Sequence, residues 1–226
     1  MTSLKNNKLI FLIAALFSII NFTLIINATI PEAVFVKEGY SRWIFYYHVP
    51  IAWNACLAFL FGGIYSALYL FRGKVKYDNK ALAFSELGAM FGFLVLFSGF
   101  VWASPAWGTN WTWEPRLTTT LMLELIYLGY FMIKAYGGPY EKTSIYRAYI
   151  SIMAVLMLPL IYYSVKLLPQ SVQAHPGHGT FLEYGGFKIF IFSLISFSIL
   201  LFYLYQLRIY RLDKIIYEKI KSSNEK

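Results

Sequence analysis

The chain has 226 residues, of which 58% are hydrophobic and only 14% are charged. Soluble domains carry about 25% charged residues, so this composition excludes an ordinary soluble fold and indicates a membrane protein. The formal net charge of +9 would suit a nucleic-acid-binding protein, but the placement of the charges along the chain argues against that class. The single cysteine, Cys56, lies in an apolar run and excludes a disulfide within the chain.

Six apolar segments are long enough to cross a bilayer as helices, which takes about 20 residues. We therefore expect an all-α integral membrane protein that forms one domain over residues 1–226. The first segment is longer than the core of a signal peptide, so we interpret it as an uncleaved anchor. In chain order, the predicted spans are residues 8–29, 43–71, 83–103, 117–136, 148–168 and 187–207.

Positive charge is divided unequally between the two sides of this predicted bundle. With the N-terminus inside, the cytoplasmic segments hold 15 of the Lys and Arg residues and the outer segments hold 5. Because an excess of positive charge marks the cytoplasmic side, we expect both termini in the cytoplasm. The basic tail, residues 208–226, is then explained by topology and by contact with lipid. Residues 30–42, 104–116 and 169–186 become the outer segments.

The middle outer segment contains four of the six tryptophans, within FVWASPAWGTNWTWEPRLTT at residues 100–119. They form either an aromatic belt at the membrane interface or a platform for a planar ligand. Gly108 keeps the backbone irregular and permits close approach of such a ligand. Trp111 and Trp113 would face the same way in an extended segment, and Pro115 suits the first turn of the fourth helix. Composition alone leaves both alternatives open.

All three histidines fall on the outer side. His48 lies just before Pro50 at membrane depth, where ionisable residues are functional candidates, although a hydrogen-bonded structural role is the alternative. His175 and His178 form HPGH in the last outer segment, with no Cys or Asp nearby to complete a four-ligand zinc site. Haem iron needs only one imidazole from each face of its ring. His48 with His175, or alternatively with His178, would supply that pair.

Arg116 follows the tryptophans at the outer membrane boundary. It could pair with Glu114 or lipid headgroups, or it could hold a carboxylate through its planar guanidinium. Since haem carries two propionates, the second role would suit a haem platform. Glu86 and Glu124 fall inside the third and fourth predicted helices, where we expect structural or polar-network roles. The chain contains no Walker A sequence, dinucleotide-binding glycine motif or nucleophile elbow.

The sequence WGTNWTWEPRLT at residues 107–118 resembles the tryptophan-rich WWD motif of the haem-handling membrane proteins of cytochrome c biogenesis. YYHVPIAW at residues 46–53 and LPLIYYSV at residues 158–165 resemble the two histidine segments of that family. Length and six predicted spans point to its CcmC branch. The chain departs from the family pattern at Glu114, where Asp is common, and at KLLP after the fifth span, where an aromatic pair is usual.

The resemblance implies a haem-handling subunit of the bacterial inner membrane that is not an enzyme. It implies haem b as the bound group, with His48 and His175, or alternatively His178, as axial ligands. The tryptophans that it places beside the haem are Trp107, Trp111 and Trp113. It further implies delivery of haem to the chaperone CcmE, and association with the ABC-type subunits CcmA and CcmB and the small subunit CcmD.

Two other classes of protein remain alternatives. An electron-transfer cytochrome b subunit with permanently bound haem normally has histidine pairs on facing helices, and this chain has one histidine in a predicted span. A quinone-dependent membrane oxidoreductase is the other, and no pair of redox cysteines supports it.

Overall fold

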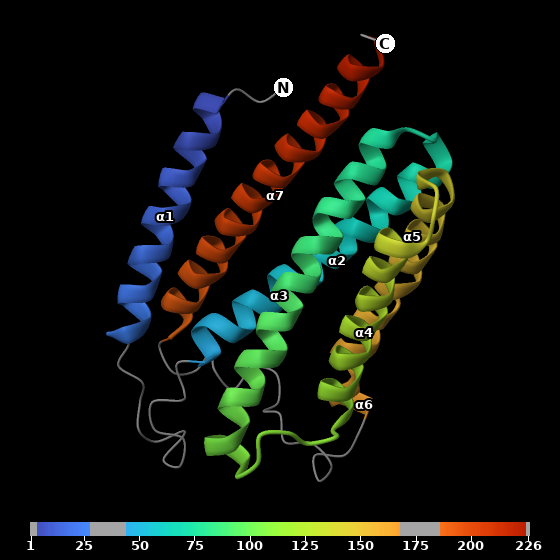
Figure 1. Cartoon of the computed structure of the whole chain (residues 1–226). Coiled ribbons are helices and arrows are strands. Elements are labelled where there is room, and N and C mark those ends of the chain that lie inside the picture. The colour runs from blue at the N-terminus through green and yellow to red at the C-terminus, as the bar shows by residue number, and fades with distance from the viewer. Residues whose placement is uncertain (1–3, 28–43, 168–185, 225–226) are drawn as a thin grey trace.

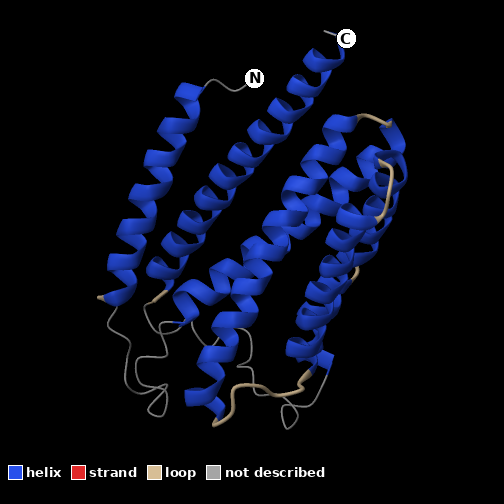
Figure 2. Ribbon diagram, viewed as in Figure 1, coloured by secondary structure: helices blue, strands red, loops and turns tan. Residues whose placement is uncertain are grey.

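The computed structural model describes residues 4–27, 44–167 and 186–224. All regular secondary structure in these residues is helical (Figure 2). Six candidate spans are long and apolar enough to cross a membrane, which confirms the predicted all-α membrane fold. The helices are α1 (Leu4–Ile26), α2 (Ile44–Arg72), α3 (Val75–Trp107), α4 (Pro115–Tyr136), α5 (Tyr140–Val155), α6 (Met157–Leu167) and α7 (Phe187–Asn224).

The predicted spans agree with the helices at their centres and differ at their ends. α4 begins with Pro115 in its first turn, as predicted. The fifth span comprises two helices, because α5 ends at Val155 and α6 begins at Met157. Pro159 has no N–H to donate to the carbonyl four residues earlier, that of Val155, and its ring crowds that carbonyl. α7 continues to Asn224, so most of the predicted tail extends the last helix.

The helices α2, α3, α4 and α5 pack around the central apolar core (Figure 1). Phe59, Phe91, Tyr127 and Tyr130 are its largest fully buried apolar side chains. The rings of Phe59 and Tyr127 stack with their centroids 4.4 Å apart, which joins α2 to α4. Within a membrane this core is stabilised by close packing rather than by the exclusion of water, since lipid tails are as apolar as the side chains.

α1 packs on α7, on the side of the molecule away from α4 and α5 (Figure 1). The rings of Phe17 and Phe192 stack at 5.4 Å between these two helices. α7 in turn contacts α2 and α3, and the rings of Phe84 and Tyr205 stack at 4.3 Å across the α3–α7 contact. α7 therefore connects α1 to the four-helix core.

The bundle has two distinct ends (Figure 1). The start of α1, the end of α7 and the α2–α3 and α4–α5 turns lie together at one end, which we call the termini end. The start of α2 and residues 108–114 lie at the other, which we call the loop end. Toward the termini end, Glu86 accepts hydrogen bonds from Lys134 at 2.6 Å and from Arg208 Nη2 at 2.9 Å. This network links α3, α4 and α7, and it confirms the polar-network role expected of Glu86.

Candidate functional site

His48 lies in the second turn of α2, near the loop end. Its Nδ1 is 2.8 Å from the Oγ of Ser98 on α3. The Ser98 hydroxyl donates to the carbonyl of Leu94 at 2.7 Å, so its oxygen is left to accept from the imidazole. When the imidazole donates from Nδ1 to this oxygen, the lone pair lies on Nε2. An imidazole oriented in this way by a neighbouring group is the usual arrangement of a metal-binding histidine.

Gly99 allows α3 to lie close to the His48 ring. A Cβ at this position would be 3.3 Å from His48 Cε1, which is tighter than ordinary van der Waals contact. Ser98 and Gly99 together therefore hold the ring, one by a hydrogen bond and the other by the absence of a side chain. Neither residue was predicted from the sequence, because no local pattern indicates which turn of α3 faces His48.

The non-helical part of the tryptophan-rich segment is residues 108–114, which is shorter than the predicted 104–116. α3 continues through Pro105 to Trp107, so Trp107 is the last residue of a helix and not part of a loop. Gly108 ends α3 with a φ of 74°, and its N–H donates to the Ser104 carbonyl at 2.9 Å. This left-handed cap favours glycine, and nothing lies within 4 Å of where a Cβ would be.

The four tryptophans form two edge-to-face pairs. The ring centroids of Trp102 and Trp107 are 5.0 Å apart, and those of Trp111 and Trp113 are 5.7 Å apart. The contact between the second pair agrees with the predicted alternation, in which both rings lie on one side of the segment. Trp113 is 76% exposed, whereas the indole Nε1 atoms of Trp102 and Trp111 are buried without a hydrogen-bond partner in the described part of the chain.

A hydrogen bond folds the loop back toward His48. The side-chain amide of Asn110 donates to the carbonyl of Phe100 at 3.1 Å. Phe100 directly follows Gly99, which adjoins the His48 ring. Trp102 is three residues beyond Gly99, about 4.5 Å farther along the axis of α3. The tryptophan-rich segment and His48 are thus brought to the same end of α3, and Asn110 was not predicted to take part.

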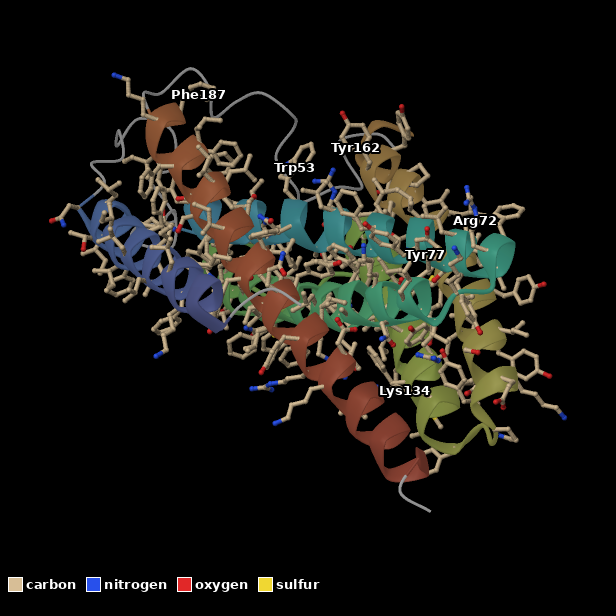
Figure 3. The ribbon with its side chains drawn as sticks, turned by 90° about the horizontal axis from the view of Figure 1, so that it is seen from above. Trp53, Arg72, Tyr77, Lys134, Tyr162 and Phe187 are labelled. Carbon is tan, nitrogen blue, oxygen red and sulfur yellow. The ribbon has the colours of Figure 1, made fainter. Side chains whose placement is uncertain are left out.

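Arg116 is half-buried in the first turn of α4. Glu114 and Tyr162 are the ionisable groups that act most strongly on its guanidinium. The nearby Glu114 carboxylate favours the ion-pairing alternative, while Tyr162 brings α6 to the same site. Trp53 of α2 and Tyr162 lie on the same face of the molecule (Figure 3). The chemistry available here is a guanidinium near the Tyr162 ring, which suits a ligand that carries carboxylates.

His175 and His178 lie outside the described residues. The chain re-enters the described part at Gly186, immediately before α7. Gly186 packs against the hydroxyl of Tyr46, and a side chain there would collide with it unless the tyrosine moved. Since Tyr46 is two residues before His48 on α2, the end of the HPGH-bearing segment is attached beside the turn that carries His48.

These features define a multi-pass helical membrane protein with an aromatic, histidine-bearing site at the loop end of the bundle. The sequence model of the CcmC family, described as Heme exporter protein C, matches residues 2–223, and the chain belongs to this family. The resemblance carried by the tryptophan and histidine motifs is therefore confirmed.

Individual relatives match over a shorter region. Heme exporter protein C of Escherichia coli strain K12 is 34% identical over 137 residues, which covers 58% of this chain and 53% of the relative. Heme exporter protein C of Bradyrhizobium diazoefficiens is 34% identical over 130 residues, which covers 57% of this chain and 49% of the relative. A ccmC-like mitochondrial protein of Arabidopsis thaliana is 35% identical over 133 residues, which covers 58% of this chain and 49% of the relative. The chain thus spans about half the length of the curated relatives it matches.

Proposed function

We propose that this protein binds haem b at the loop end and passes it to a CcmE-type haem chaperone. The observation that carries the proposal is the His48–Ser98 hydrogen bond at 2.8 Å beside the tryptophan-rich segment. With the proton on Nδ1, Nε2 would be the iron ligand, and the indole N–H groups of Trp102 and Trp111, which have no partner among the described residues, would donate to carboxylates. Haem presents both iron and carboxylates, so these residues fit it. Membership of the CcmC family supports haem as the cargo.

His48 would bind one face of the haem iron, and His175, or alternatively His178, would bind the other. Iron in haem takes one axial ligand from each side of the ring. The contact of Gly186 with Tyr46 supports a ligand from this last segment, because it attaches the segment one turn or less from His48.

Trp107, Trp111 and Trp113 would cover the apolar porphyrin, and Arg116 would hold a propionate. The exposure of Trp113 suits a cargo that must leave, since a fully enclosed haem would be released slowly. Haem would arrive and leave chemically unchanged, so we assign no catalytic residue and no enzymatic activity. The alternative reading of the tryptophans as an interfacial belt would leave the partnerless indole N–H groups without a role.

We further propose that the protein lies in a bacterial inner membrane with the termini end in the cytoplasm. The start of α1 and the end of α7 lie at that end, and Arg72 and Lys134 are in the last turns of α2 and α4, which also end there; both observations support this orientation (Figure 1). CcmA, CcmB and CcmD would then assemble with the chain as partners, and membrane lipid would contact the basic end.

The experiment that tests the function is haem transfer from the purified full chain in lipid nanodiscs. Haem-loaded protein is mixed with the purified acceptor chaperone, the two are separated, and haem absorbance is measured on each. We expect haem to move from the wild-type protein to the acceptor. The His48→Ala variant should retain haem only weakly. Haem that stays bound and is repeatedly reduced by quinol and reoxidised would instead establish the alternative, an electron-transfer cytochrome b subunit.

A further inference from the structure

Glu124 is an unpaired carboxyl group in the middle of a membrane span. It is the tenth residue of the 22-residue helix α4, and its Oε1 is buried without a hydrogen-bond partner among the described residues. The carboxyl group packs directly against Gly92 of α3, where any side chain would collide with it. The ring of Phe59 is also close, with its Cε2 3.5 Å from where a Cβ of Gly92 would be. The glycine thus provides the space that the carboxyl group occupies.

No cation is placed to neutralise this carboxyl group. Glu86 forms ion pairs with Lys134 and Arg208, and Asp78 forms one with Arg147, so none of these cations pairs with Glu124. The charged residues on the surrounding helices α2, α3, α4 and α5 are Arg72, Lys76, Asp78, Lys80, Glu86, Arg116, Lys134, Glu141, Lys142 and Arg147. At 1.5 Å of rise per residue, each is about 9 Å or more from Glu124 along the helix axes. An unpaired charge in an apolar interior is strongly disfavoured, so this site stabilises the carboxyl group in its neutral, proton-bearing form.

Polar side chains continue from Glu124 toward the termini end. Tyr127, one turn farther along α4, lies with its hydroxyl 3.2 Å from Ser151 Oγ of α5. Ser85 of α3 lies beside both Tyr127 and Tyr130. The guanidinium of Arg147 lies over the ring of Tyr130, 5.6 Å from its centroid. We call this set the polar band: it consists of Ser85, Tyr127, Tyr130, Arg147 and Ser151.

The polar band contains more hydrogen-bonding groups than its members satisfy. Arg147 uses only Nη2 for its two bonds to Asp78, at 2.9 and 3.2 Å. Its Nε and Nη1, together with Tyr130 Oη and Ser85 Oγ, are buried without partners in the part of the chain that the structure describes. Buried polar groups of this kind are normally satisfied by internal water. The band reaches the surface at Tyr140, which is exposed and donates to Asp78 at 2.9 Å.

We propose that the polar band holds internal water and forms a proton path from the termini end to a proton-binding site at Glu124. The path lies in the half of the core opposite the candidate haem site and does not depend on haem. The carboxyl group binds and releases one proton, which travels as an exchange of hydrogen bonds along the water and hydroxyl groups. Glu124 is therefore a membrane-embedded proton site, a function separate from ligand binding at the loop end.

Infrared spectroscopy of the haem-free full chain in nanodiscs tests this proposal. A protonated carboxylic acid gives a separate carbonyl band, and we expect that band at neutral pH in the wild type and its loss in Glu124→Gln. After transfer into D₂O the band shifts as the proton exchanges. Tyr130→Phe should slow this shift by about tenfold, which corresponds to about 1.4 kcal/mol added to the barrier for proton exchange. Ser85→Ala should slow it as well. Tyr149→Phe, at an exposed position on α5, is the matched control and should exchange as the wild type does.

Two results would overturn the proposal. One is an unchanged carbonyl region in folded Glu124→Gln, which would show that Glu124 does not carry the proton. The other is wild-type exchange in both Tyr130→Phe and Ser85→Ala, which would show that the polar band is not the path. Because both measurements use protein without haem, neither result depends on the proposed haem transfer.

Discussion

Replacement of Ser98 by alanine isolates the contribution of the hydrogen bond that orients His48. The variant removes the oxygen that accepts from Nδ1, at 2.8 Å in the wild type, and leaves the imidazole itself unchanged. The Nδ1–H then loses its Ser98 acceptor, and the ring can move its proton to Nε2. That tautomer has no lone pair at the nitrogen proposed to bind iron.

The expected loss follows from the cost of removing one supporting bond. Leaving a buried donor unsatisfied costs about 1–3 kcal/mol, and loss of a partner that orients a metal-binding histidine weakens metal binding by about 10–100-fold. Because His48 is only part-buried, we expect the lower limit, about tenfold weaker haem binding. Ser98→Thr keeps the hydroxyl group and should remain close to the wild type.

The assay is a haem titration of purified protein in nanodiscs, followed by the low-spin absorption spectrum. Ser198→Ala is the matched control, because Ser198 on α7 donates to the Leu194 carbonyl at 2.8 Å as Ser98 does to Leu94. Thermal unfolding of both variants checks that the fold is kept. Equal haem affinity in Ser98→Ala and Ser198→Ala would refute the reasoning about the tautomer.

Three other outcomes are expected. Trp113→Ala should weaken haem retention by about tenfold and Trp113→Phe much less, since an aromatic contact contributes on the order of 1 kcal/mol beyond its area; haem content measures this, and no change favours the interfacial belt. Reporter fusions after Gly73 and after Gly108 should report opposite sides of the membrane, and matching results would contradict the orientation. Asp78→Asn should lower the free energy of unfolding by about 3–5 kcal/mol, because Arg147 becomes a buried unpaired charge; thermal unfolding no different from that of Glu141→Gln would contradict this.

The sequence was sufficient for the number and centres of the spans. A helix that crosses a bilayer must be apolar over about 20 residues, and that constraint is visible locally. Pro115 also marked its helix start correctly, because proline in the first turn loses no hydrogen bond. The polar-network role predicted for Glu86 was also correct, since a carboxylate within a predicted span requires partners.

Helix ends were less predictable. The third span was predicted to end at residue 103, yet α3 continues through Pro105 to Trp107 and is ended by Gly108, whose left-handed backbone sets the boundary. Pro159, by contrast, separates α5 from α6. The same residue type gives both outcomes because neighbouring side chains and helices decide whether the freed carbonyl is tolerated.

Contacts between helices were the part of the site that could not be predicted. Ser98 and Gly99 meet His48 because of the register between α2 and α3, which depends on packing along their whole length. Asn110 reaches Phe100 only because α3 extends to Trp107 and the remaining loop is short. Glu124 was expected to have a satisfied role, and the contact with Gly92 that leaves its Oε1 without a partner is likewise set by packing.

The visible spectrum of the haem-loaded protein with each histidine replaced in turn tests the central claim most directly. If haem is bound at the loop end between His48 and the last outer segment, His48→Ala abolishes the bis-histidine low-spin spectrum. One of His175→Ala and His178→Ala also abolishes it, and the other leaves it largely intact. An unchanged low-spin spectrum in all three variants would contradict the account, because iron would then be bound by none of these residues.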